Sequence, residues 1–471
     1  MNKVDKTKLL GTAKVGPLFV KLAMPAVLAQ MVMMVNNVID RAWVGHIPDD
    51  GALSLGAVGV SLPITHLFLA FIMMIASGMG PVTSILLGKG RREDTGKVSG
   101  ACFSLAILLN LAIAAGLTVF ADPVLTAFGA GEASLPFARS YLKTLAWGAP
   151  FTNMLLLLVM WFNAQGYVTE GVRLSLTSVV VNAVLDPVFI FLCKMGVTGA
   201  ALATNLGAAV ALAYGVWFAV RDDRLIRFGF ADLVPRAKWW MPSVALGVST
   251  FLNVSLDALT QLFFNMGLQK YGGELAVSAM AMLALPVFIV MSMSLGMSMG
   301  AQPIVSYNYG QGRLDRVRTA NRIFVYAAFG CSFAAWAVAM VWPSAFWRVF
   351  TGDPELLAYT TDHTRLYYAA LCLNGAQAAH LYIIKFLGQV KMSLFLSVLR
   401  RLVLLLPLII VFPLVLEWDK VNAVLLASPV SGVLAFLLTA ACYLYVMKKL
   451  KVEKSNGWRP RRYGFKKGNV R

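Results

Sequence analysis

Residues 78–90 read GMGPVTSILLGKG, and residues 300–312 read GAQPIVSYNYGQG. Both segments carry glycine, proline, serine and two further glycines at matching positions, 222 residues apart: Gly78/Gly300, Pro81/Pro303, Ser84/Ser306, Gly88/Gly310 and Gly90/Gly312. Gly166 and Ser175 recur at the same offset as Gly388 and Ser397. Matches at one long, fixed spacing indicate an internal duplication. The sequence therefore predicts two halves of similar build.

Each half is rich in apolar runs. The 471-residue chain is 59% hydrophobic and only 13% charged, and crossing a bilayer takes about 20 apolar residues in a helix. The runs predict an all-α polytopic membrane protein with twelve transmembrane helices, near 17–39, 52–77, 98–120, 143–162, 172–193, 197–220, 239–267, 275–303, 322–343, 364–384, 394–416 and 421–446. The five cysteines stand singly, without zinc-type spacing or a disulfide framework.

Six spans per half is an even number, so both halves start from the same side of the membrane. We therefore expect two six-helix lobes related by a pseudo-two-fold axis along the membrane normal, with a cavity between them. The expected boundaries are an N-terminal tail 1–14, an N-terminal lobe 15–220, an inter-lobe loop 221–238, a C-terminal lobe 239–446 and a basic tail 447–471.

The positive charges indicate how the chain is oriented. The two tails and the loops after even-numbered spans hold 30 of the 41 lysines and arginines, and the opposite side holds 8. Because cytoplasmic segments carry the excess of basic residues, both termini are predicted to be cytoplasmic. The net charge of +19 is then explained by these segments and by anionic lipid near them, so nucleic acid is not an expected partner.

Residues 178–189, SVVVNAVLDPVF, place a carboxylate inside an apolar run. Ser178, Asn182 and Asp186 are four residues apart, so they share one helix face. Pro187 follows at once and removes a backbone donor, which bends a helix and makes this residue a candidate hinge. A carboxylate in a bilayer is costly unless it is paired, hydrated or protonated, so this face suits an ion or proton site. Of the 22 acidic residues, only Asp40, Asp186 and Asp257 fall within or at the edge of a span.

Four stretches, in order along the chain, resemble motifs of the multidrug and toxic compound extrusion (MATE) family. They are NVIDRAWVG at 37–45, NAVLDP at 182–187, GVTGAALAT at 196–204 and AQPIVSYNYGQG at 301–312, followed by Arg313 and Arg316. Within the family, the chain is similar to the prokaryotic DinF/MepA-like branch. The resemblance implies two V-shaped lobes and cation-coupled antiport of amphipathic, often cationic compounds.

The same resemblance implies a cation or proton site in the N-terminal lobe, built from Asp40, Asn182, Asp186 and Thr204. Asp186 and Thr204 each lie seven residues from the same membrane face, which is about 10 Å of helix. Oxygen ligands at one depth are what Na⁺ or a shared proton needs. We expect no other metal, no cofactor and no catalytic residues, so the chain is not predicted to be an enzyme.

The second lobe departs from the pattern of some relatives. Span 7 carries a polar stripe with one residue every fourth position: Ser249, Asn253, Asp257, Gln261 and Asn265. Some branches carry an acid at the position of Asn253, whereas here the acid comes one turn later, at Asp257. Arg400 matches a family arginine, and both it and Arg401 could pair with Asp257 or extend toward the cytoplasmic face. The candidates for substrate binding or coupling are Asn37, Asn253, Asp257, Gln261 and Arg400.

The leading hypothesis is a secondary multidrug exporter in a bacterial or archaeal cell membrane, acting as a monomer. It would exchange small amphipathic, cationic compounds for Na⁺ or H⁺ by alternating access. One alternative is a specific metabolite exporter on the same scaffold. Another is a lipid-linked oligosaccharide flippase, for which Arg400 and Arg401 are the only basic residues within the spans that could hold pyrophosphate. Lipid is the expected surrounding partner in every case.

Overall fold

The computed structural model describes residues 6–47, 51–128, 130–132, 134–221, 229–348 and 353–455. Parts of the expected N-terminal tail, inter-lobe loop and C-terminal tail lie outside these residues. The boundaries proposed for the lobes and tails stay predictions.

Every regular element among the described residues is a helix. In chain order they are α1 (Lys6–Thr12), α2 (Val15–Gly45), α3 (Gly51–Gly88), α4 (Arg92–Ala127), α5 (Leu135–Ala164), α6 (Val168–Pro187), η1 (Val188–Leu192), α7 (Gly196–Arg221), η2 (Phe230–Leu233), α8 (Ala237–Gly310), α9 (Leu314–Val341), α10 (Pro343–Trp347), α11 (Pro354–Tyr367), α12 (Leu371–Phe386), α13 (Val390–Val398), η3 (Leu399–Leu405), α14 (Leu406–Val415) and α15 (Lys420–Ser455). The all-α class predicted from the sequence is confirmed.

Ten of the described helical segments are long and apolar enough to cross a membrane. One of them, α8, has 74 residues and contains a non-helical glycine, Gly273, with φ 68° and ψ −161°. Gly78 packs against the backbone of Ser243, and Gly88 packs against that of Tyr307. Both ends of α8 therefore lie beside the same end of α3, so the chain reverses at Gly273 and α8 provides two spans. The consecutive helices α11 and α12 account for the remaining predicted span.

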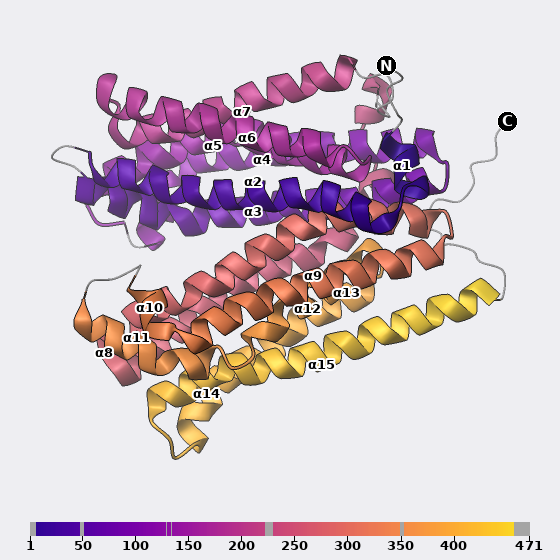
Figure 1. Ribbon diagram of the computed structural model, residues 1–471. Helices are drawn as coiled ribbons and strands as arrows, with labels where there is room; N and C mark the ends of the chain where they lie inside the picture. Colours follow the sequence, from indigo (N-terminus) through magenta and orange to yellow (C-terminus); the bar gives the residue numbers. More distant parts are fainter. Residues whose placement is uncertain are drawn as a thin grey trace.

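The helices form two lobes, with α2 to α7 in one and α8 to α15 in the other (Figure 1). The internal repeat is visible in matched hydrogen bonds. The Ser84 hydroxyl donates to the Ala164 carbonyl at 2.6 Å, and the Ser306 hydroxyl donates to the Phe386 carbonyl at 2.9 Å. Both partners in the second bond lie 222 residues after those in the first. Each repeat segment also ends in a glycine with positive φ, 74° at Gly90 and 76° at Gly312, a conformation that favours glycine.

The lobes meet through glycines that let backbones approach closely. A Cβ atom on Gly88 would lie 2.1 Å from the carbonyl oxygen of Tyr307, and one on Gly310 would lie 2.3 Å from that of Ile85. These two contacts are equivalent under the repeat, so α3 and the second arm of α8 cross as a symmetric pair. Small residues allow such close helix packing in membranes, where the hydrophobic effect does not hold helices together.

Two short segments cross from one lobe to the other. Carbonyls at the C-terminal end of α1 and just after it accept hydrogen bonds from the C-terminal lobe: Leu10 from Asn308 at 2.8 Å, Gly11 from Arg313 at 2.5 Å and Ala13 from Arg316 at 2.6 Å. The short helix η2 precedes the C-terminal lobe in the chain, as α1 precedes the N-terminal lobe. It packs on α4 of the N-terminal lobe, where Gly100 faces the backbone of Asp232. Each lobe is thus held by the segment that precedes the other.

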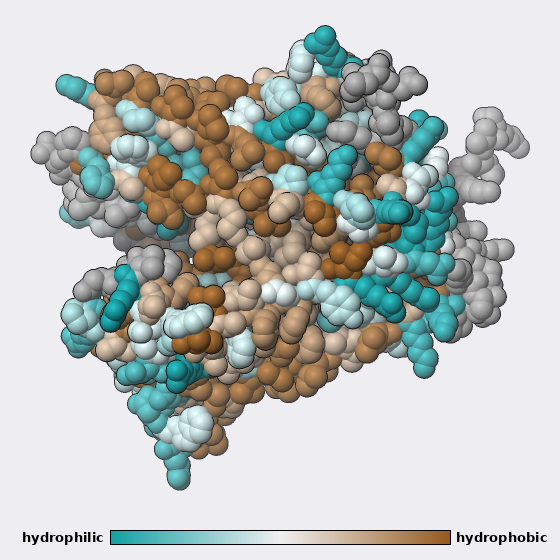
Figure 2. Space-filling view, in the orientation of Figure 1, coloured by the Kyte–Doolittle hydropathy of each residue, from teal (hydrophilic) through white to brown (hydrophobic). Residues whose placement is uncertain are grey.

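The distribution of apolar and polar side chains on the surface is typical of a membrane-spanning protein. Figure 2 shows apolar side chains along the flanks of both lobes and polar side chains gathered at the end where both termini lie. At the opposite end a notch separates the lobes. The molecule is therefore closed at the end that carries the termini and open at the other.

We expect Gly310→Val to weaken the contact between the lobes, since its side chain would overlap the Ile85 backbone. Overpacking of this kind costs about 1–3 kcal/mol. The melting temperature of the purified protein in detergent should fall by several degrees. Gly330→Val is the matched control, because Gly330 also lies within a helix and has open space around it. Equal melting temperatures for the two variants would contradict the assigned role of Gly310.

Candidate functional site

The two faces of α6 differ sharply in exposure. Val180 and Val184 are 59% and 61% exposed, whereas Asn182 and Asp186 are 4% and 1% exposed. The polar stripe predicted from the four-residue spacing is therefore present and points into the N-terminal lobe. The valines lie on the outer surface, where lipid would cover them.

Two features bring α7 against this stripe. The α-helix of α6 ends at Pro187, and the five-residue π-helix η1 follows it; π-helical turns often mark functional sites. Glycines of α7 also pack on the α6–η1 backbone: a Cβ on Gly199 would lie 2.8 Å from the Phe189 carbonyl carbon, and one on Gly207 would lie 2.6 Å from the Ser178 carbonyl oxygen. This close packing places Thr204 beside Asn182.

One hydrogen-bonded network joins side chains of three helices of the N-terminal lobe. Its members are Asn36 and Asp40 of α2, Asn182 and Asp186 of α6, and Thr204 of α7. The Asn36 amide nitrogen lies 3.1 and 3.0 Å from the two carboxyl oxygens of Asp40 and 2.8 Å from the Asn182 amide oxygen. The Asn182 amide nitrogen lies 3.1 Å from Asp186 Oδ1 and 3.4 Å from Thr204 Oγ1. The structure therefore brings together all four residues that the sequence assigned to this site.

The network leaves the two acids facing each other. The carboxyl groups of Asp40 and Asp186 lie near enough to interact electrostatically. Oδ2 of Asp186 is fully buried and has no hydrogen-bond partner among the described residues. Two carboxylates at close range repel each other unless a proton or a cation lies between them. The arrangement is thus chemically suited to bind one positive charge.

Asn36 was missed in the sequence, where the adjacent Asn37 was named as a candidate for substrate binding or coupling. The Asn37 side chain is exposed and donates to the backbone carbonyl of Met33 at 2.8 Å, so it lies outside the network. A signal for Asn36 was available, since it precedes Asp40 by four residues and helical positions with that spacing share a face.

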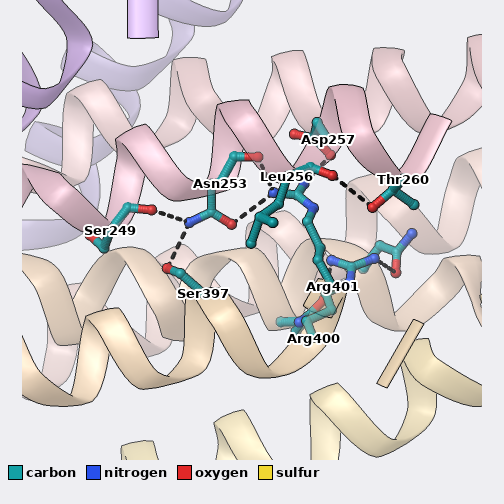
Figure 3. Close-up of polar contacts among 10 residues, drawn as sticks. Ser249, Asn253, Leu256, Asp257, Thr260, Ser397, Arg400 and Arg401 are labelled. Atoms are coloured by element: carbon teal, nitrogen blue, oxygen red, sulfur yellow. Dashed lines mark hydrogen bonds and ion pairs between the residues drawn. The ribbon is translucent and has the colours of Figure 1, made fainter. Parts of the chain in front are cut away.

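In the C-terminal lobe, Arg401 reaches from η3 to the first arm of α8, where its guanidinium lies between Asn253 and Asp257 (Figure 3). It forms an ion pair with Asp257 and donates to the Asn253 carbonyl and amide oxygens at 2.6 and 2.9 Å. Asn253 donates in turn to Ser397 at 2.7 Å. Asp257 is therefore the ion-pair partner of Arg401, one of the two outcomes expected from the sequence.

Arg400 points to a different helix. It donates to the amide oxygen of Gln377 at 2.5 Å and to that of Asn374 at 3.4 Å, both on α12. Its guanidinium is therefore directed within the lobe, toward α12. Gln261 bonds only weakly to Asn265, at 3.3 Å, and is not connected to either arginine by a hydrogen bond between described residues.

The helix order and the site can now be compared with known proteins. The profile of the MatE family matches residues 25–188 and 249–411, which is most of the chain. The chain belongs to the MatE family. Multidrug export protein MepA of Staphylococcus haemolyticus is 22% identical over 437 residues, covering 92% of this chain and 94% of MepA.

Solved structures agree with the assignment to the MatE family. A crystal structure of MATE in complex with MaD3S has a TM-score of 0.88 at 20% identity, covering 96% of this chain and all of that one. A MOP superfamily transporter from Pyrococcus furiosus, described as having a binding pocket of reverse polarity, has a TM-score of 0.85 with the same identity and coverage. At this level of identity the likeness shows the two-lobe fold alone.

The two neighbouring asparagines give a direct test of the network. We expect Asn36→Leu to lower transport about tenfold or more, because hydrogen bonds to a charged group contribute about 1.5–3 kcal/mol. Asn37→Leu should have a far smaller effect, since that side chain contacts only backbone. Dye efflux from cells expressing each variant at equal levels measures both. A larger loss of transport in Asn37→Leu than in Asn36→Leu would contradict the assignment of Asn36 to the network.

Proposed function

We propose that this MatE-family protein is a secondary active exporter that expels small amphipathic organic molecules in exchange for Na⁺ or H⁺. The observation that carries the proposal is the pair of acids, half-buried Asp40 and buried Asp186, with one carboxyl oxygen of Asp186 left without a hydrogen-bond partner among the described residues. The name of the MepA relative, a multidrug export protein, supports export of several compounds.

The oxygen atoms around the acid pair suit a hard cation as well as a proton. Thr204 adds a hydroxyl oxygen near the two carboxyl groups, while Asn182 directs its amide nitrogen to Asp186 and Thr204 and its amide oxygen to Asn36. Carboxyl and hydroxyl oxygens suit hard cations. Within the part of the chain that the structure describes, no three His, Cys, Asp or Glu side chains gather as at a transition-metal site. Na⁺ and H⁺ are thus the two coupling ions to compare.

We place both termini in the cytoplasm on the distribution of basic residues. The notch between the lobes, at the end away from the termini (Figure 2), then faces outside. A cation entering from there would bind between Asp40 and Asp186 and cancel their repulsion. The inward movement of each positive charge gains about 2.3 kcal/mol per 100 mV of membrane potential.

Cation binding would be transmitted through α6 in this mechanism. Asp186 directly precedes Pro187 and the π-helix η1, a segment without regular α-helical bonding that can adjust at low cost. Closing the acids around a cation would move this segment, lower the affinity for cargo and favour rocking of the lobes. We expect the protein to act as a monomer in a prokaryotic cell membrane.

Purified protein in liposomes, loaded with ethidium and given either a Na⁺ or a proton gradient, tests the proposal. We expect one of the two gradients to drive ethidium movement, and Asp186→Asn to abolish it, because an amide cannot exchange a proton or balance a cation. Val184→Ala, on the lipid-facing side of α6, serves as the control and should transport at the wild-type rate. Transport by Asp186→Asn at that same rate would exclude the acid pair as the coupling site.

A further inference from the structure

A cavity opens in the C-terminal lobe at the end of the molecule that carries the termini (Figure 1). It has a volume of about 230 Å³ and lies between the start of α13 and the C-terminal part of α15. A single buried water needs far less room, whereas a drug-sized ligand usually occupies about 300–1,000 Å³. The cavity therefore suits a small group, such as one end of a larger molecule.

Part of the cavity lining is polar and basic. The polar lining residues are Gln389 and Lys391 at the start of α13, and Tyr445 and Lys449 on α15. The lining segments, 389–392 and 445–451, contain four lysines and no aspartate or glutamate. Neither Lys391 nor Lys449 forms an ion pair with a carboxylate among the described residues. Two ammonium groups that converge from different helices, without an acid beside them, attract an anion, and lysine commonly binds phosphate.

The rest of the lining is apolar. It consists of Met392, Val446 and Leu450, of which the last two are buried in the protein core. Tyr445 lies at the edge of the cavity and is 59% exposed, and its neighbour Leu444 is 64% exposed. Tyr445 thus belongs both to the cavity and to the apolar flank of α15. A soluble anion gains little from apolar walls, whereas a phospholipid combines a phosphate with acyl chains that such a flank can contact.

The two lysines lie at the depth of lipid headgroups. Lys391 precedes the predicted span 394–416 by three residues, and Lys449 follows the predicted span 421–446 by three residues. Three residues correspond to about 4.5 Å of helix, which places both ammonium groups in the interfacial layer next to the hydrocarbon core. Tyr445, one turn before Lys449, is a residue type that is enriched in this layer.

The equivalent corner of the N-terminal lobe is built differently. Next to the matched glycines, the offset of 222 places Tyr167 where the C-terminal lobe has Gln389. It also places Thr169 where that lobe has Lys391. Tyr167 is only 2% exposed, and its ring packs edge-on against Phe218 of α7 at a centroid distance of 6.1 Å. An aromatic ring therefore fills this corner in the first lobe, and the basic cavity belongs to the second lobe and not to the shared fold.

We propose that this cavity binds the phosphate headgroup of an anionic phospholipid, in the leaflet on the side of the termini. Lys391 and Lys449 hold the phosphate from α13 and α15. Gln389 and Tyr445 are placed to donate hydrogen bonds to its oxygens, and the acyl chains extend along the apolar flank of α15. The bound lipid connects the two helices and stabilises this end of the lobe. The inference requires neither ion coupling nor export, so it stands or fails independently of the proposed function.

Native mass spectrometry of the purified full-length protein in detergent, titrated with dioleoylphosphatidylglycerol, tests the proposal. The double variant Lys391→Gln/Lys449→Gln should bind the first lipid about tenfold or more weakly than the wild-type protein, because both charges that hold the headgroup are lost. The matched control is Lys448→Gln/Lys451→Gln, which removes two exposed lysines of α15 that do not line the cavity. This control should bind the lipid as tightly as the wild-type protein. Equal weakening in the two double variants would overturn the proposal, since it would indicate general charge attraction.

Two further ligands identify what the cavity recognises. Dioleoylphosphatidylcholine has the same acyl chains but no net charge, so the wild-type protein should bind it more weakly than phosphatidylglycerol. Phosphatidylglycerol should also raise the melting temperature, as a ligand of the folded state does, and inorganic phosphate at the same concentration should not. Equal affinity for the two lipids would overturn the proposal. An equal rise in melting temperature with inorganic phosphate would also overturn it, because the cavity would then take a soluble anion.

Discussion

The structure depends on one close contact between the halves of the chain. Gly88 of α3 meets the Tyr307 backbone, and Gly310 of α8 meets the Ile85 backbone, at positions related by the repeat. A side chain at either glycine would overlap backbone of the other helix and force the two helices apart. Further close contacts, such as Gly78 against Ser243 and Gly247 against Met74, extend along the same boundary between α3 and α8, so small residues join the two bundles over much of this boundary.

Around this symmetric contact, the lobes share a backbone plan and differ in chemistry. Asp186 and Arg400 both lie on a fifth helix interrupted by a π-helical segment, but one is acidic and the other is basic. Duplication of the fold therefore did not duplicate the site.

Much of the architecture was predictable from local patterns. The fixed spacing of Gly78 and Gly300 indicated the repeat, and apolar runs gave the spans, including the two merged in α8. The four-residue spacing of Asn182 and Asp186 gave the inward face of α6, which their burial confirms. These features follow from residues close together in one helix or from a repeated sequence pattern. Both kinds of information can be read directly from the sequence.

Contacts between helices were harder to predict. Asn36 joins the N-terminal network because α2 is oriented with that face, not the face of Asn37, toward α6. The partners of Arg400 lie on α12, 23 and 26 residues away. A hydropathy pattern does not show which face of one apolar helix is turned toward another, so these contacts could not be predicted. The close approach of Asp40 and Asp186 likewise depends on packing between helices distant in the sequence.

The position of α1 has a consequence for biosynthesis. Its last carbonyls need partners, as at any helix end, and those partners are Asn308, Arg313 and Arg316. A short helix is therefore fixed by residues about 300 positions later in the chain. These bonds can form only after the second arm of α8 has been synthesised, so the docking of α1 marks the assembly of the two halves.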